Sequence, residues 1–215
     1  MFLTFITFLP FLGAVCLAFM PKENVNAIKQ TALAVAVTDF LLSLMLWTNF
    51  DNTTHKMQFG LNIPWIEQWG INYHIGLDGI SLLLYVMTTF LTMICVIASW
   101  DVKKHIREYM IAMLALSTGM LGVFIALDLF MFYVFWEFQL VPMYIIVGVW
   151  GGPRRIYASI KFFLFTAVGS LLMLVAILWI YFHIQQTTGV ATADILYITD
   201  HLDISLDASK WLWMA

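Results

Sequence analysis

Charged residues are scarce in this sequence. Asp, Glu, Lys and Arg make up only 11% of its 215 residues, whereas 62% are hydrophobic and the mean hydropathy is +0.90. A typical soluble domain has about 25% charged residues. The composition therefore excludes a soluble domain and predicts a polytopic membrane protein in a lipid bilayer. The net charge is −3 and no block of basic residues occurs, so we expect no nucleic acid partner.

Cysteine is also scarce. Cys16 and Cys95 each lie in an apolar run and form neither a CxxC motif nor a Cys/His spacing typical of metal ligands. We expect no metal site and no disulfide framework, and we interpret both cysteines as small core residues. The opening segment, MFLTFITFLPF, has no basic residue and no evident cleavage site, so it should remain as a helix rather than act as a cleaved signal peptide.

Apolar runs long enough to cross a bilayer dominate the chain. A span needs about 20 apolar residues, and six such runs occur, at 2–20, 28–47, 79–99, 109–127, 129–150 and 156–182. They predict an all-α polytopic membrane helix bundle, with residues 1–215 as a single membrane domain. A seventh apolar run begins at Trp211, and the sequence ends at Ala215. We therefore expect the sequence to be the front part of a longer protein.

The basic residues predict the orientation. Seven of the ten lysines and arginines lie in the first, third and fifth connections. They are Lys22, Lys29, Lys103, Lys104, Arg107, Arg154 and Arg155. Connections rich in Lys and Arg stay in the cytoplasm. The N-terminus should therefore lie outside, in a multi-pass protein of the inner (cytoplasmic) membrane of a bacterium.

Two long connections are predicted at the outer surface. Residues 51–77 carry Trp65, Trp69 and Tyr73 at spacings of four, which favours an amphipathic interfacial stretch. Alternation in FGLNIPW equally allows a short β-hairpin. Residues 184–210 have apolar positions spaced as in an amphipathic helix with a solvated acidic face. Asp78, between the first loop and the third run, is expected to be a helix N-cap, with a role in proton entry as the alternative.

Glu137 is the acid at the centre of the fifth run, LFMFYVFWEFQLVPMYIIVGVW. A lone carboxylate at the bilayer midplane costs about 2.5–3.5 kcal/mol on insertion scales, so such a residue is neutral, paired or facing internal water. Pro142 has no N–H for the carbonyl of Phe138, which predicts a kink one turn away. Since burial favours the neutral form and a nearby cation the charged form, a charge moving beside Glu137 would make it a proton-relay element. The alternative is a neutral acid that bonds a neighbouring helix.

Two further ionisable residues lie inside apolar runs. Lys161 is about 8 Å into the sixth run and Glu137 about 20 Å into the fifth, at about 1.5 Å per residue. The gap of about 12 Å makes a direct ion pair unexpected, and Lys161 either snorkels to the headgroups or joins a water-linked relay. Asp39 lies near the midplane of the second run, where it faces a polar seam or stays protonated.

Two stretches carry a family resemblance. FYVFWEFQLVPMYIIVGVWGGPRRIYASIKFFLFT, residues 132–166, closely resembles the fifth helix and following turn of the subunit M (chain 4) family of the proton-pumping NADH:quinone oxidoreductase. IGLDGISLLL, residues 75–84, resembles the start of the third helix in the same family and its sister subunit L. The resemblance implies an antiporter-like fold that helps to translocate protons while respiratory complex I passes electrons from NADH to quinone.

The resemblance also implies partners and site residues. Glu137 matches the family's fifth-helix glutamate, which pairs with a lysine of a broken seventh helix, and no such position occurs in these 215 residues. For Lys161 the resemblance implies only a possible part in the relay, and Asp39 matches no family position. Expected partners are the other membrane subunits, including the other antiporter-like ones, together with protons and internal water. No cofactor is expected in this chain.

Three alternatives remain open from the sequence. The chain also resembles a subunit of a multi-subunit cation/proton antiporter. A truncated, non-catalytic assembly scaffold is the second, and a small-molecule transporter is the third and least favoured, because six helices show no paired polar cavity.

Overall fold

The computed structural model describes residues 1–54, 56–204 and 206–214. Its elements in chain order are α1 (Phe2–Phe19), α2 (Val25–Thr48), β1 (Gln58–Ile66), η1 (Glu67–Trp69), β2 (Ile71–Leu77), α3 (Gly79–Ala98), η2 (Ser99–Asp101), α4 (Ile106–Ile125), α5 (Leu129–Trp150), α6 (Arg155–Thr188), α7 (Ile195–His201) and α8 (Leu206–Met214). Six helices of the described chain, α1 to α6, are long and apolar enough to cross a membrane. The predicted helical membrane bundle is confirmed.

The helix bounds agree with the apolar runs to within three residues, except at the end of α6. This helix continues six residues beyond the predicted end at 182. Its 34 residues reach about 51 Å at about 1.5 Å each, more than the roughly 30 Å of a hydrocarbon core. The extra turns follow Tyr181, which donates a hydrogen bond to the Trp69 carbonyl at 2.9 Å. They begin at His183, whose Nε2 lies 3.1 Å from the Asp203 carbonyl oxygen.

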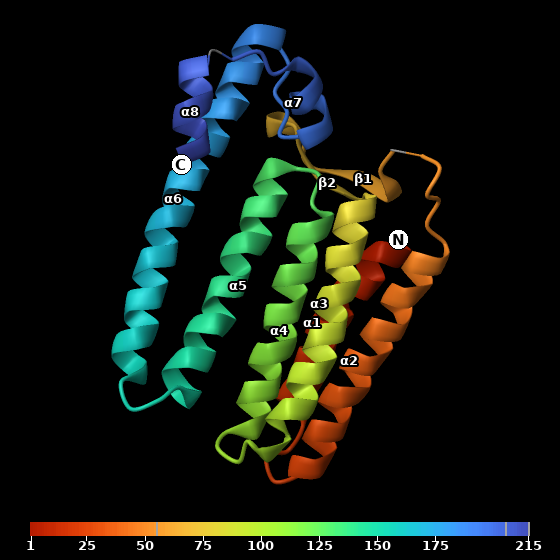
Figure 1. Cartoon of the computed structure of the whole chain (residues 1–215), viewed down its shortest axis with the longest axis vertical. Helices are drawn as coiled ribbons and strands as arrows, with labels where there is room; N and C mark the ends of the chain where they lie inside the picture. The colour runs from red at the N-terminus through yellow and green to blue at the C-terminus, as the bar shows by residue number, and fades with distance from the viewer. Residues whose placement is uncertain (55, 205, 215) are drawn as a thin grey trace.

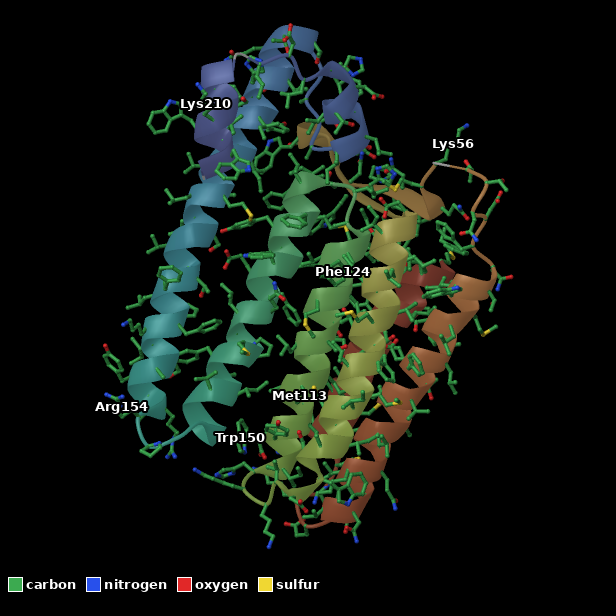
Figure 2. All side chains as sticks on the ribbon, viewed as in Figure 1. Lys56, Met113, Phe124, Trp150, Arg154 and Lys210 are labelled. Carbon is green, nitrogen blue, oxygen red and sulfur yellow. The ribbon has the colours of Figure 1, made fainter. Side chains whose placement is uncertain are left out.

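Helices α1 to α4 form the body of the bundle, α5 packs on α4, and α6 packs on α5 at the edge (Figure 1). The strands and α7 lie together at one end, here called the hairpin end. Lys56 and Lys210 lie at this end, and Arg154 lies at the opposite, basic end (Figure 2). This segregation agrees with the distribution of basic residues in the connections.

Residues 58–77 form a β-hairpin, which decides between the two structures that the sequence allowed. The antiparallel register pairs Leu61 with Ile75 and Ile63 with Tyr73. Gly70 turns the chain with φ 60°, and a Cβ there would lie 1.8 Å from the Ala191 carbonyl oxygen. Only glycine allows both this backbone conformation and this close approach of the 191–193 loop.

Two sequence interpretations are wrong in detail. Cys16 and Cys95 are exposed rather than buried, because a membrane helix keeps apolar residues on its lipid side as well as in its core. The 184–210 segment is not one amphipathic helix, since it contains the end of α6, then α7, then the start of α8. Its Asp194 is half-buried and bonded rather than solvated.

The buried side chains form two apolar clusters. One lies toward the hairpin end and includes Leu3, Leu46 and Ile125. The other lies toward the basic end and includes Leu17, Ile28 and Met110. Between them, α1 to α4 each contribute at least one buried hydroxyl or acid, from Thr7, Asp39, Ser43, Thr89, Thr92, Ser117 and Thr118. The body of the bundle therefore has a polar layer across its middle.

Candidate functional site

Asp128 fixes the start of the helix that carries Glu137. Its fully buried side chain accepts hydrogen bonds from the backbone N–H groups of Phe130, at 3.0 Å, and Met131, at 3.1 Å. It also accepts one from Asn72 of β2 at 3.1 Å. Burial raises the pKa of Asp128, and the charge of Asp194 adds to this effect. One residue thus caps α5 and ties it to the hairpin.

Helix α5 lies very close to α4. A Cβ added at Gly119 would lie 3.0 Å from Cβ of Gln139, and one at Gly122 would lie 2.2 Å from the Phe135 ring. Small residues allow helix backbones to approach closely in membranes, where apolar packing replaces the hydrophobic effect. The two glycines hold the stretch around Glu137 at a fixed height and rotation against α4.

Glu137 faces α6 from the middle of α5. The hydroxyl of Tyr133, one turn earlier on α5, faces both the Glu137 carboxylate and the Ser170 hydroxyl on α6. The Oε1 atom of Glu137 is buried and has no hydrogen-bond partner among the described residues. A buried carboxylate oxygen with free acceptor capacity can bind a proton, a water molecule or a cationic side chain.

Polar groups also line a cavity of about 600 Å³ between α4, α5 and α6. Gln139 contributes from α5, next but one to Glu137, while Thr166 and Ser170 contribute from α6. Apolar side chains such as Met120 and Met173 complete the wall. The rest of the lining is mostly apolar, so the three polar side chains are the main groups of this cavity that can bind water.

The α5–α6 contacts place Lys161 far from Glu137. Tyr144 packs on Phe163, and Gly148 lies against Ser159, as expected for antiparallel helices. This register puts Lys161 level with position 145 or 146, about 12 Å along the helix from Glu137 at about 1.5 Å per residue. The exposed Lys161 places its Nζ 5.9 Å from the centroid of the Tyr157 ring. No ion pair joins the two residues in the described part of the chain.

The remaining predicted residues have distinct surroundings. Asp78 is the N-cap of α3, because its Oδ1 accepts a hydrogen bond from the Ser81 N–H at 2.7 Å; a role in proton entry stays a prediction. Pro142 is buried inside a continuous α5, so the predicted kink also stays a prediction. Asp39 is 1% exposed on α2, a helix that packs on α1, α3 and α4.

The sequence did not reveal one further polar group. Nδ1 of His74 on β2 lies 2.7 Å from Oδ2 of Asp194, whose Oδ1 caps α7. The backbone N–H of Leu127 donates to the His74 carbonyl, and that of Ile195 donates to the Leu127 carbonyl. These bonds join the hairpin, the α4–α5 turn and α7 at one level. An acid just before a short helix was the only sequence signal, since the partner is 120 residues away.

Known proteins are similar to this chain in sequence. The family model described as "NADH:quinone oxidoreductase/Mrp antiporter, TM" matches residues 126–206. NADH-quinone oxidoreductase subunit M of Rhodobacter capsulatus is 46% identical over 195 residues, which cover 88% of this chain and 37% of that protein. NADH-ubiquinone oxidoreductase chain 4 of Arabidopsis thaliana is 42% identical over 208 residues, which cover 96% of this chain and 41% of that protein. The chain is homologous to subunit M (chain 4). It spans about two fifths of the length of these relatives.

Solved structures share the fold of this subunit M homologue. A chain of respiratory complex I from Thermus thermophilus with bound NADH matches with a TM-score of 0.80 and 26% identity, over 100% of this chain and 42% of that one. A chain of the Mrp complex from Dietzia sp. DQ12-45-1b matches with a TM-score of 0.74 and 19% identity, over 92% of this chain and 21% of that one. The second likeness concerns the fold alone. Both neighbours are parts of multi-subunit assemblies, and the predicted antiporter-like membrane fold is confirmed.

Proposed function

We propose that this multi-pass membrane chain forms part of the proton-translocating machinery of an NADH:quinone oxidoreductase. The observation that carries the proposal is the geometry of Glu137. Its Oε1 is buried and unpartnered among the described residues, in the middle of a spanning helix and beside the Tyr133 hydroxyl. The identity of up to 46% with subunit M supports this function over others.

Glu137 would bind and release a proton as the local charge changes. A cation close to the carboxylate favours its ionised form, and withdrawal of that cation from a site of low polarity favours the neutral form. The family resemblance implies that a lysine from a later helix supplies the cation. The Tyr133 and Ser170 hydroxyls, which face each other beside the carboxylate, offer a first step for the proton out of the site. Lys161, about 12 Å away along the helices, would act at most through intervening water.

We propose that redox chemistry takes place elsewhere in the complex. The chain would hold no cofactor of its own and would respond to quinone reduction through the neighbouring membrane subunits, including other antiporter-like ones. The exposed faces of α5 and α6 are apolar enough for such contacts or for lipid. The basic end would face the cytoplasm, with the N-terminus and the hairpin on the outer side of a bacterial inner membrane.

A multi-subunit cation/proton antiporter is the second candidate, and the fold shared with the Mrp complex favours it. The two functions make different predictions for purified, reconstituted protein. Sodium-dependent proton transport without NADH oxidation would support the antiporter, whereas proton transport that requires NADH and quinone would support the oxidoreductase.

The test of Glu137 is the Glu137→Gln substitution in the full-length subunit. Glutamine keeps the size of the side chain but cannot carry a proton in this way. NADH-driven proton pumping and coupled quinone reduction should both fall sharply in membrane vesicles. Unchanged transport would overturn the assignment and would favour a non-catalytic scaffold.

A further inference from the structure

Asp39 is the most deeply buried unpartnered acid of the described chain that the proposed function does not use. It is 1% exposed, and neither Oδ1 nor Oδ2 has a hydrogen-bond partner among the described residues. Isolated charged carboxylates are very costly to bury. The cost falls if the group is protonated, so the location itself points to a bound proton.

Asp39 lies between two hydroxyl pairs of the polar layer. On one side, Ser43 of α2 and Thr89 of α3 are hydrogen-bonded at 2.8 Å. Because α2 and α3 run antiparallel (Figure 1), position 39 is level with position 93, next to Thr92. Thr92 donates to Ser117 of α4 at 3.2 Å. The acid therefore has hydroxyl groups, which both donate and accept hydrogen bonds, one turn away on α2 and at its level on α3.

A row of hydroxyls leads from this acid to the hairpin end. Asp39 interacts electrostatically with Tyr85 of α3, whose hydroxyl is 3.0 Å from the Thr7 hydroxyl of α1. Thr4 lies one turn nearer the end of α1, and its hydroxyl faces that of Tyr73 on β2. The Thr4 and Tyr73 pair lacks the geometry of a full hydrogen bond.

The unpartnered atoms are concentrated along this row. Of six buried side-chain atoms without a hydrogen-bond partner in the described chain, four belong to it, namely Oγ1 of Thr4, the Tyr73 hydroxyl and both Asp39 carboxylate oxygens. Native proteins leave few such groups, and those that remain commonly have a functional reason or bind water. A chain of groups with spare hydrogen-bonding capacity is what proton hopping requires.

Among the residues that the structure describes, no cation pairs with Asp39. The titratable side chain that interacts with it on the packed elements is Tyr85 on α3, and Tyr85 in turn interacts with Tyr73 on β2. Lys29 lies near the other end of α2 and donates to the Trp100 carbonyl. On α4, Arg107 and Glu108 lie in the first turn, at the basic end, with Lys22 beside Glu108. The middle of α1 carries no ionisable residue.

We propose that Asp39 is a second proton-binding site, filled from the hairpin end along the hydroxyls of Tyr73, Thr4, Thr7 and Tyr85. The neighbouring hydroxyl, or a water molecule bound to it, gives its proton to an Asp39 oxygen and takes one from the preceding member of the row. No group changes its net protonation except Asp39. Asp39 lies nine residues from the end of α2, about 14 Å at about 1.5 Å per residue. The site does not depend on Glu137, because α5 is not among the helices that pack on α2.

Infrared spectroscopy of the full-length protein in its membrane complex tests this site. A protonated Asp39 should give an acid carbonyl band that shifts in heavy water, disappears in Asp39→Asn and moves in Asp39→Glu. Tyr85→Phe keeps the ring and removes one relay hydroxyl. The exchange of the Asp39 proton for deuterium, which produces the band shift, should therefore slow about tenfold or more. Tyr144→Phe, a tyrosine that packs on Phe163 outside the row, should leave the rate unchanged.

Two results would overturn the proposal. If the Asp39 variants remove or move no acid carbonyl band, Asp39 does not carry a proton. If the band exchanges at the same rate in Tyr85→Phe and in the wild type, the row does not supply the proton. If Asp39→Asn fails to assemble, the band position in Asp39→Glu and the exchange rate in Tyr85→Phe still test the proposal. The Glu137→Gln variant should keep the Asp39 band. Loss of pumping in Glu137→Gln and loss of the band in the Asp39 variants are therefore separate outcomes, so the failure of one proposal can be told from the failure of the other.

Discussion

Gly122 of α4 and Phe135 of α5 leave no space between them for a methyl group. A Cβ at position 122 would lie 2.2 Å from Cδ1 of Phe135. Phe135 is 8% exposed and belongs to the apolar cluster at the hairpin end, so its ring cannot turn away freely. The position of Glu137, two residues later, therefore depends on the absence of a side chain on the neighbouring helix.

Gly122→Ala should destabilise the protein. Overpacking a core typically costs about 1–3 kcal/mol, and the thermal midpoint of the detergent-solubilised protein should fall accordingly. Gly169→Ala is the matched control, because a Cβ there meets nothing within 4 Å and alanine favours a helix over glycine by about 1 kcal/mol. Equal midpoints for the two variants would contradict the close α4–α5 packing.

Tyr133→Phe should weaken proton transfer without unfolding the site. The substitution removes the hydroxyl that faces Glu137 and Ser170 and keeps the ring. A hydrogen bond to a charged group contributes about 1.5–3 kcal/mol, and about 1.4 kcal/mol corresponds to a tenfold change. NADH-driven pumping should fall by about tenfold while the thermal midpoint stays close to that of the wild type. A rate equal to that of Tyr144→Phe would exclude Tyr133 from the relay.

Lys161→Ala should leave pumping within about twofold of the wild type. The Lys161 ammonium lies beside Tyr157 near the basic end, where long side chains reach the headgroups. Its level on α6 is about 12 Å from that of Glu137. Proton transport in vesicles measures the effect. A loss comparable to that of Glu137→Gln would instead assign Lys161 to the relay.

Asp128 should make folding stability depend on pH. Burial raises its pKa above the ordinary value of 3.8, so the folded state binds this proton more tightly than the unfolded state. The contribution of Asp128 to the free energy of unfolding is then fully present below pH 3.8. It is lost as the pH rises through the pKa of Asp128 in the folded state. The midpoint difference between the wild type and Asp128→Asn should therefore shrink from about pH 4 upward. A midpoint difference that grows with pH would contradict a pKa of Asp128 that is raised by folding.

Much of the fold follows from the sequence because membrane spans depend on local composition. The runs at 2–20 and 129–150 predict α1 and α5 closely, since about 20 apolar residues match the thickness of the bilayer. The end of α6 is different. Its last polar turns follow Tyr181, which bonds the Trp69 carbonyl, and begin at His183, which lies against the Asp203 carbonyl. No local pattern encodes contacts between residues so far apart.

The candidate site was only partly predictable. Glu137 is evident as an acid in an apolar helix, and the depth argument that separates it from Lys161 agrees with the α5–α6 register. The roles of Tyr133 and of the hydroxyl row beside Asp39 depend on which helix faces which, because a tyrosine or threonine in an apolar run is common and uninformative alone. The sequence therefore identified Asp39 only as an ionisable residue in an apolar run. The hydroxyl row on α1 and α3 could be identified only from the structure.

The rate of NADH-driven proton pumping tests the central role of Glu137 most directly. It should be measured in sealed membrane vesicles that contain equal amounts of assembled complex, for Glu137→Gln and for Glu67→Gln, which changes an exposed glutamate on η1. We predict that Glu137→Gln lowers NADH-driven pumping by about tenfold or more, while Glu67→Gln keeps the wild-type value. Equal pumping by the two variants would contradict the account.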